Sequence, residues 1–287
     1  MTLNEEWSVE IEPRKGFGKL NLKELWQYRD LVYLLARRSF VSIYKQTVLG
    51  PAWAVLQPLL TTLIFTVVFG KIANLSTDGV PQFLFYMCGN VPWNFFAKCM
   101  EKTAHTFLEN EKIFGKVYFP RLSAPIATVL VTFVNFAIQF ALFLCFLAFY
   151  AFRSSPAVSV NWGLACLLPL VLLEMGMLGL GVGVAVSALT VRYRDLSMLI
   201  SFGVSLWMYV SPVAYPASLM MANYPKFAGI YMLNPMAPVI EYFRAAFLGT
   251  NTFNPLYLLL SAGVTLVVLA GGVLLFNRAE KNFVDMI

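Results

Sequence analysis

The run SAPIATVLVTFVNFAIQFALFLCFLAF, residues 123–149, decides the fold class of this chain. It has no charged residue, and it exceeds the ~20 apolar residues that cross a bilayer as a helix. The whole chain of 287 residues is 59% hydrophobic and 13% charged, with a mean hydropathy of +0.69, far from the averages of soluble domains. We therefore predict an all-α polytopic membrane protein. Residues 1–50 are charge-rich, and we expect no signal peptide among them.

Further apolar segments on both sides of this run bring the expected number of transmembrane helices to six. Their bounds are about 50–70, 82–102, 123–149, 162–189, 196–210 and 255–276. The second is interrupted by Asn90, Pro92 and Asn94, which predicts a bent or broken helix whose backbone groups neighbouring helices satisfy. We expect one domain over 50–276, preceded by an irregular arm (1–20) and an amphipathic interface helix region (21–49), and followed by a tail (277–287).

The interface helix is predicted from the pattern between residues 22 and 46, which is helical but too charged to span a membrane. One face carries Ala36, Phe40, Ile43 and Tyr44, and the opposite face carries Arg38, Ser42 and Lys45. A basic amphipathic face of this kind is typical of a helix that lies along headgroups or a partner. A solvated helix of a small soluble domain is the alternative, but the region has little apolar sequence for a separate core.

A proline-rich segment, residues 211–252, separates the last two spans. Asn234 and Pro235 predict the start of a helix, and Gly249 predicts its end. A helix of about fourteen residues is ~21 Å long, too short for the ~30 Å hydrocarbon core. We expect it to be re-entrant or to lie at the membrane interface.

The basic residues predict which side of the membrane each loop occupies. Sixteen of the twenty-one Lys and Arg residues fall on the side that carries both termini and the 102–121 loop. Basic residues accumulate in cytoplasmic loops, so we expect both termini inside and the proline-rich segment outside. This topology accounts for the net charge of +6 without nucleic acid.

The cytoplasmic loop ENEKIFGKVYFPR, residues 109–121, has an unusual composition. It combines charges with apolar side chains that we expect to be exposed, namely Ile113, Phe114, Val117, Tyr118 and Phe119. A loop that only joined two helices would not require them, so we predict that another protein binds here.

Catalytic and metal-binding patterns are not found in the sequence. His105 has no neighbouring Cys or paired carboxylates, and the Gly-Lys pairs lack the following Ser or Thr of a phosphate-binding loop. Cys88, Cys99, Cys145 and Cys166 are interpreted as small core residues. An enzyme is therefore not expected, no cofactor or metal is expected in this chain, and any nucleotide-driven step requires another chain.

Polar residues inside the predicted spans leave two interpretations open. Thr128, Thr132, Asn135 and Gln139 form one stripe, and Gln57, Thr61, Ser197, Ser201 and Ser205 extend the polar set. They either line a path for a polyhydroxylated substrate or bond helices together. Glu174 is the sole acid near mid-span, where it is either a proton-coupling group or a structural carboxyl. Gly179 and Gly183 predict a close helix contact.

Several motifs, in order along the chain, resemble the permease subunit of polysaccharide-exporting ABC type-2 transporters, the O-antigen and teichoic-acid exporters. They are YKQTVLGPAWAVLQPL (44–59), KVYFPR (116–121), VRYRDL (191–196), SPVAYP (211–216) and LNPM (233–236). The resemblance implies a homodimer in the bacterial inner membrane that exports an undecaprenyl-diphosphate-linked glycan. It also implies two copies of a separate ATPase subunit, which hold ATP and Mg²⁺.

The resemblance also implies roles for individual residues. It places a coupling helix at about 108–115 and short outward-side gate helices at about 216–222 and 235–248. The expected ATPase-coupling residues are Glu109, Glu111, Lys112, Ile113, Phe114, Lys116, Tyr118, Phe119 and Arg121. The expected gate residues are Tyr215, Pro216, Asn234, Pro235, Glu241 and Arg244.

Basic groups at the cytoplasmic leaflet would attract the diphosphate, and the candidates are Arg37, Arg38, Lys45, Lys98 and Lys102. The alternatives are an ABC type-2 permease for another amphiphile, such as a lipid or a drug, and a proton-coupled secondary carrier.

Overall fold

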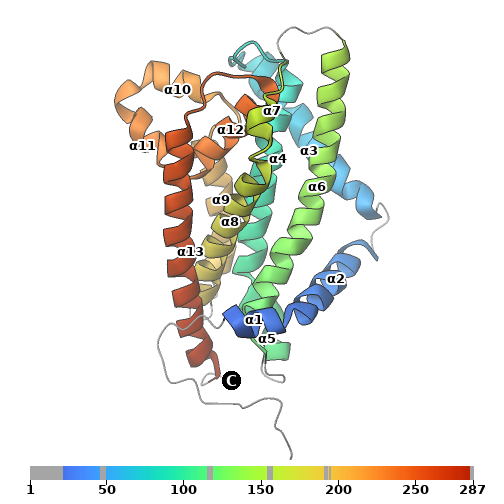
Figure 1. Ribbon diagram of the computed structural model, residues 1–287, viewed down its shortest axis with the longest axis vertical. Helices are drawn as coiled ribbons and strands as arrows, with labels where there is room; N and C mark the ends of the chain where they lie inside the picture. Colours follow the sequence, from blue (N-terminus) through green and yellow to red (C-terminus); the bar gives the residue numbers. More distant parts are fainter. Residues whose placement is uncertain are drawn as a thin grey trace, which may run out of the picture.

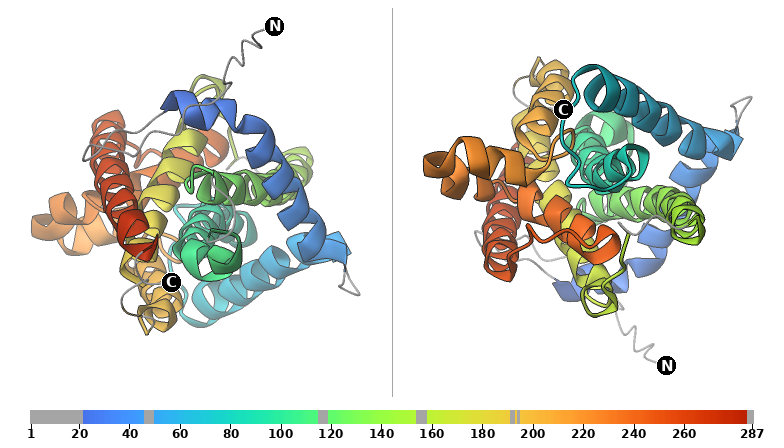
Figure 2. Two further views of the ribbon diagram at one scale, coloured as in Figure 1. Left: turned by 90° about the horizontal axis from the view of Figure 1, so that it is seen from below. Right: turned by 90° about the horizontal axis from the view of Figure 1, so that it is seen from above.

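The computed structural model describes residues 22–45, 50–114, 119–153, 158–190, 193 and 195–284. Every regular element within these ranges is a helix, as predicted (Figure 1). The arm at 1–20 lies outside the described residues. The long helices run side by side in one bundle, and they alternate in direction along the chain (Figures 1 and 2).

Helix α4 (Gln82–Ala104) is the centre of this bundle. It packs against α3 (Trp53–Phe65), α6 (Ser123–Phe152), α8 (Leu168–Thr190), α9 (Leu196–Val210) and α12 (Met236–Leu248). Nearly all of its side chains are buried, including Asn90 and Trp93. The helix continues through Pro92, so of the expected bend or break, the break is wrong. A helix that is enclosed by other helices contacts protein rather than lipid. Its sequence therefore does not have to be uniformly apolar.

Among the residues that the structure describes, four helical segments are long and apolar enough to cross a membrane. They are Trp53–Ile72, which joins α3 to the π-helical turn η2 (Thr66–Ile72), then α6, α8, and Pro255–Ala279 within α13 (Pro255–Val284). Helix α9 is apolar but has only 15 residues. Helix α4 carries Lys98, Glu101 and Lys102 near its end. Length and hydropathy thus support four of the six expected spans, and α4 and α9 run alongside them (Figure 1).

The bundle has two different ends, which we call the α5 end and the α12 end. The α5 end holds α1 (Leu22–Gln27), the start of α2 (Arg29–Lys45), α5 (Thr106–Phe114) and the last turns of α13 (Figure 1). The α12 end holds α7 (Trp162–Ala165), α10 (Ala217–Asn223), α11 (Ala228–Met232) and α12. Short 3-10 turns at Gly50–Ala52 and Pro225–Phe227 complete the elements.

The short helices predicted in the proline-rich segment are present as α10 and α12. The Asn234 Oδ1 accepts a hydrogen bond of 3.2 Å from the Met236 N–H, so this residue caps α12 as expected. Gly249 ends α12 with a φ of 74°, a left-handed conformation that favours glycine. Other bounds differ from expectation: α6 extends to Phe152, α8 begins at Leu168 after the separate α7, and α13 continues to Val284.

Glycines allow α8 to pack closely on both of its neighbours. A Cβ at Gly179 would lie 2.6 Å from the Cβ of Cys99 on α4, and one at Gly183 would overlap Thr103. The predicted Gly179–Gly183 packing face is therefore confirmed. On another side of α8, Gly181 contacts α13, where a Cβ at Gly272 would overlap the Gly181 carbonyl oxygen. Cys88 and Cys99 are core residues as expected, whereas Cys145 and Cys166 are exposed, so the expectation is wrong for these two.

Candidate functional site

The α5 end contains the predicted coupling helix, which the structure describes as α5. Phe107 of α5 stacks on Phe276 of α13, with ring centroids 4.5 Å apart. Phe119, after the loop, joins the same apolar cluster and is only 7% exposed. The expectation that Phe119 is exposed is therefore wrong, because its ring anchors the end of the loop against the bundle.

The other predicted coupling residues are only partly described. Glu109 is exposed on α5, and Arg121 is half-buried. The last residues of α5 are Glu111, Lys112, Ile113 and Phe114, and their side chains are not described. Outside the described residues altogether are Lys116 and Tyr118. What the structure gives is a short helix at the expected position, held to α4 and α8.

The basic candidates for headgroup binding lie on α2 and on the last turns of α4. Arg37, Arg38 and Lys45 are exposed along α2, which packs against α6, while Ala36 and Phe40 are half-buried. This division fits the predicted amphipathic pattern, although the side chains of Ile43 and Tyr44 are not described. Lys102 is exposed, and the half-buried Lys98 donates a hydrogen bond of 3.4 Å from its Nζ to Gln57 Oε1 of α3.

The structure separates the polar residues that were candidates for one channel lining. On α6, Thr132 and Gln139 are each 2% exposed. The Thr132 hydroxyl donates to the Thr128 carbonyl at 2.9 Å, and the Asn135 amide donates to the Val131 carbonyl at 3.3 Å. This stripe therefore faces the interior of the helix bundle, with Thr128 and Asn135 half-buried. Gln57, Ser201 and Ser205 are instead exposed on α3 and α9, and Thr61 is half-buried.

A buried ion pair organises the α12 end. Arg244 and Glu241 of α12 are each 1% exposed, and Arg244 Nη1 lies 2.8 Å from Glu241 Oε1. The Thr252 hydroxyl donates to Glu241 Oε2, and the Ala217 N–H at the start of α10 donates to Oε1 at 3.3 Å. The carboxylate thus links α12 to two other segments, the start of α10 and the loop after α12.

Arg244 extends the same network to the segment between α9 and α10. Its Nη1 donates to the Tyr215 carbonyl at 3.3 Å, and its Nη2 donates to the Val213 carbonyl at 3.2 Å. The guanidinium carbon lies 3.8 Å from the ring centroid of Phe85 on α4, within the range of a cation–π interaction. Arg244 therefore ties the proline-rich segment to the central helix.

Gly89 leaves room for this arrangement on α4. A Cβ at this position would lie 3.1 Å from the Val213 carbonyl oxygen and 3.3 Å from Arg244 Nη2. A side chain here would crowd both the segment between α9 and α10 and the guanidinium. Neither Gly89 nor Phe85 was singled out from the sequence, where each is one of many apolar positions.

Asn234 forms a second connection at the α12 end. Its Oδ1 accepts a hydrogen bond of 2.9 Å from Trp207 Nε1 of α9, and its Nδ2 donates to Ser211 Oγ at 2.9 Å. Pro216 and Pro235 are buried beside these contacts, and the Tyr215 hydroxyl donates to the Tyr209 carbonyl at 3.1 Å. The six predicted gate residues are thus gathered at one end of the bundle.

Glu174 lies at the junction of α8, α13 and the residue before α12. It is 2% exposed, and its Oε1 lies 2.5 Å from Ser261 Oγ, which lies 2.8 Å from the Pro235 carbonyl oxygen. One hydroxyl proton serves only one acceptor. When Ser261 donates to Pro235, a protonated Glu174 must supply the hydrogen for the other bond. The other carboxyl oxygen, Oε2, has no hydrogen-bond partner among the described residues. Ser261 was not singled out from the sequence.

Comparison with known proteins gives matches over most of the chain. The family model described as ABC-2 type transporter matches residues 30–248. A Klebsiella pneumoniae protein named O-antigen export system permease protein RfbA is 28% identical over 270 residues, covering 94% of this chain and 98% of the relative. A Myxococcus xanthus protein of the same name is 26% identical over 266 residues, covering 93% of this chain and 98% of the relative.

Proposed function

Because this chain belongs to the ABC-2 type transporter family, we propose that it is the permease subunit of an ATP-driven polysaccharide exporter. Its substrate would be a lipid-linked polysaccharide such as O-antigen, carried on undecaprenyl diphosphate from the cytoplasmic side across the inner membrane. The observation that carries this proposal is the similarity to O-antigen export permeases over 94% of the chain. Six spans are part of the proposal, supported by the alternating directions of α3, α4, α6, α8, α9 and α13 (Figure 1).

The orientation follows from the basic residues. Arg37, Arg38 and Lys102 are exposed on α2 and near the end of α4, and such residues accumulate on the cytoplasmic side. We assign the α5 end to the cytoplasm, together with both termini, and the α12 end to the outside. The basic groups of α2 would then be available to the diphosphate of the lipid carrier.

The energy source must come from a partner in this proposal. Two copies of a separate ATPase subunit would bind ATP and Mg²⁺, and they would contact a homodimer of this chain at α5. Helix α5 is short, ends in a charged and aromatic loop, and packs on α4 and α8. A push on α5 would therefore reach the centre of the bundle directly.

The proton-coupled alternative has weaker support. A coupling carboxyl must exchange protons with both sides of the membrane during transport. Glu174 is 2% exposed and lies in a hydrogen-bonded chain with Ser261 and Pro235. The described contacts give Glu174 no route to either side of the membrane, although only Oε1 of its two carboxyl oxygens has a hydrogen-bond partner among the described residues.

The proposed function is tested by reconstituting the chain with its ATPase in proteoliposomes. We expect uptake of the lipid-linked glycan with ATP, and none when the ATPase carries an inactivated hydrolytic site. The variant Phe114→Ala with Tyr118→Ala should keep the permease assembled but lose ATPase binding or stimulation. The matched control is Phe149→Ala with Phe152→Ala, two exposed aromatic residues toward the other end of the bundle. Transport that persists with the inactive ATPase would contradict the proposal.

A further inference from the structure

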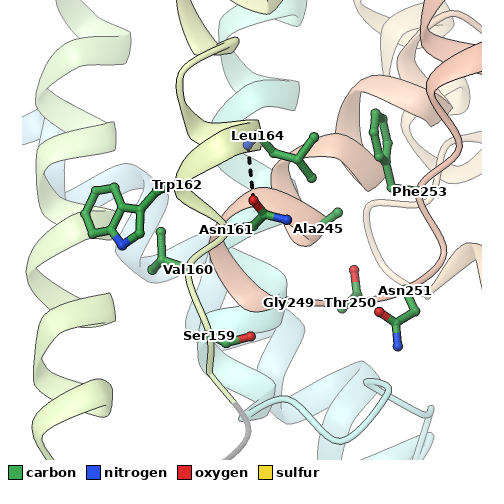
Figure 3. Close-up of a pocket in the computed structure, with 10 residues that line it drawn as sticks. All are labelled: Ser159, Val160, Asn161, Trp162, Leu164, Ala245, Gly249, Thr250, Asn251 and Phe253. Carbon is green, nitrogen blue, oxygen red and sulfur yellow. Dashed lines mark hydrogen bonds between the residues drawn. The ribbon is translucent and has the colours of Figure 1, made fainter.

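A cavity of about 600 Å³ lies at the α12 end (Figure 3). One wall is the segment that leads into α7 and includes Ser159 and Asn161. The other is the loop after α12, which includes Thr250, Asn251 and Phe253. The volume is in the range of small-molecule binding sites, about 300–1,000 Å³. Neither Glu241, Arg244 nor any described residue of α5 lines this cavity.

Hydrogen bonds fix the first wall to α12, from whose end the second wall continues. The Asn161 N–H donates to the Ala246 carbonyl of α12 at 2.8 Å, and the Tyr242 hydroxyl donates to the Leu164 carbonyl at 2.7 Å. Gly249 lies so close to Ser159 that a Cβ would overlap its hydroxyl. Thr252 holds the loop after α12 through its bond to Glu241. The cavity is therefore preformed, which lowers the entropic cost of binding a ligand.

The cavity is lined by uncharged residues, in which the polar side chains of Ser159, Asn161, Thr250 and Asn251 lie among apolar ones such as Trp162 and Phe253. Asn161 Oδ1 accepts a hydrogen bond of 3.2 Å from the Leu164 N–H, and the Nδ2 of this amide points toward the cavity (Figure 3). The Thr250 hydroxyl is buried and has no hydrogen-bond partner among the described residues. Asn251 is exposed at the edge, and Phe253 contributes a half-buried ring that packs on Tyr242. Within the described part of the chain, the lining has no Lys, Arg, His, Asp or Glu.

This chemistry selects a class of ligand. A phosphate or carboxylate is usually bound by cationic side chains, which the lining lacks. A purely apolar ligand would leave the amide and hydroxyl groups desolvated without partners, at a cost of about 1–3 kcal/mol for each group. A neutral, polyhydroxylated ligand would satisfy these groups and could pack one apolar face on the Phe253 ring.

We propose that this cavity is a binding site for a neutral sugar unit of the exported polymer on the outer side of the membrane. The inference rests on the proposed function and its orientation. The site lies beside the α12–α13 loop rather than inside the helix bundle, so it would receive sugar units that have already crossed. Binding there would hold emerging polymer near the exit and oppose its backward movement between ATP-driven steps.

The test is direct binding to the permease–ATPase complex in nanodiscs. The probe is a set of oligosaccharides prepared from the surface polysaccharide of the source cells by mild acid release and partial hydrolysis, titrated calorimetrically. The variant is Thr250→Val with Asn251→Ala, which removes two hydrogen-bonding side chains. The control is Asn223→Ala, an exposed amide at the same end of the bundle but outside the cavity.

We expect the oligosaccharides to bind the wild-type complex and the Asn223→Ala complex equally. The cavity variant should bind them about ten-fold more weakly, because each hydrogen bond to a neutral group contributes roughly 0.5–1.5 kcal/mol. Co-elution of the ATPase with each variant shows that it is folded. A Thr250→Val single variant, nearly unchanged in shape, provides the same comparison if the double variant fails to assemble.

Several outcomes would overturn the inference. Absence of oligosaccharide binding, or equal binding by wild type and the cavity variants, would exclude a sugar site here. Binding of glycerol 3-phosphate that the cavity variants weaken, with no oligosaccharide binding, would identify a lipid-headgroup site instead. ATP-driven transport of the same polymer is measured in parallel. The site can therefore fail while the proposed function stands, whereas loss of both would reject the exporter assignment.

Discussion

Arg244 and Glu241 form an ion pair at a position where neither side chain can reach solvent. Both are 1% exposed, and their nitrogen and oxygen atoms lie 2.8 Å apart. Removing one partner of a buried pair leaves a charge without compensation, which typically costs about 3–5 kcal/mol, whereas replacing both by apolar groups can be neutral. Loss of one residue of the pair should therefore destabilise the α12 end more than replacement of both residues.

We predict that Glu241→Gln lowers stability sharply and that Glu241→Gln with Arg244→Met recovers much of the loss. The single variant should lower the free energy of unfolding by about 3 kcal/mol or more, because the guanidinium keeps its carbonyl partners but loses its countercharge. Thermal unfolding of the purified chain, followed by fluorescence-detected gel filtration, gives the comparison. A double variant no more stable than the single one would show that Arg244 is held by Phe85 and the carbonyls rather than by Glu241.

Glu174 gives a second prediction at the same scale. If it is a protonated carboxyl that donates to Ser261, then Glu174→Gln supplies an N–H donor of nearly the same shape in the same place. We expect transport by the reconstituted complex to remain within about two-fold of wild type, a change below 0.5 kcal/mol. Ser261→Ala removes both hydrogen bonds and should lower the free energy of unfolding by about 1–3 kcal/mol. Complete loss of transport in Glu174→Gln with normal folding would instead support proton coupling.

At the scale of helices, close packing of α8 and α13 depends on glycine. Gly272 and Gly271 are neighbours on α13, but only Gly272 faces α8, where its Cβ would overlap the Gly181 carbonyl oxygen. A Cβ at Gly271 would meet nothing within 4 Å. The two positions thus share a helix and a residue type, and they differ only in the contact.

We predict that Gly272→Ala destabilises the protein and that Gly271→Ala does not. The first substitution must push two backbones apart, at a cost of about 1–3 kcal/mol or more, whereas the second gains up to about 1 kcal/mol in helix propensity. The midpoint of thermal unfolding in one detergent measures both. Equal midpoints would mean that α13 can shift relative to α8 without loss of packing, and the structure offers little room for that.

The same helices show which parts of the fold the sequence could predict. The lipid-facing sides of α6, α8 and α13 are apolar over the length of a bilayer, so hydropathy found them. Proline, asparagine and glycine have local conformational effects, and they correctly predicted α12, whereas α10 was expected from the family resemblance. Helix α4 appeared interrupted because hydropathy along the sequence is the same whether a helix is enclosed by protein or faces lipid. Polar residues in α4 therefore looked like a break, although other helices cover them.

The contacts within the candidate site were harder to predict. Glu241 and Arg244 were recognised, but their partners Thr252, Phe85 and Val213 come from other elements. Ser261 lies 87 residues from Glu174 in sequence. Helical periodicity indicates that a face is buried but not which face of another helix covers it. Phe119 was misjudged for the same reason, since nothing local in its sequence indicates the cluster formed by α5 and α13.

For the molecule as a whole, exposed large apolar side chains are most numerous along the sides of the bundle, and exposed basic side chains lie on α2 and at both ends, with Arg153 and Lys226 at the α12 end. Large apolar residues are exposed along the sides of the bundle, for example Leu63 on α3, Phe202 on α9 and Val267 on α13. Exposed basic residues such as Arg37, Arg38 and Lys102 belong to α2 and the last turns of α4. Apolar sides are expected where helices meet lipid or a second copy of the chain, and a basic end is expected on the cytoplasmic side.

This distribution predicts the outcome of a labelling experiment on the proposed orientation. Single cysteines are introduced at Glu109 on α5 and at Asn223 at the end of α10, both exposed, in a chain whose four native cysteines are replaced by serine or alanine. A membrane-impermeant maleimide added to intact spheroplasts should label Asn223→Cys, and it should label Glu109→Cys only after the membrane is permeabilised. Labelling after permeabilisation serves as the control for accessibility at both positions. The reverse pattern would place α5 outside, where no ATPase could reach it, and would contradict the coupling proposal together with the orientation.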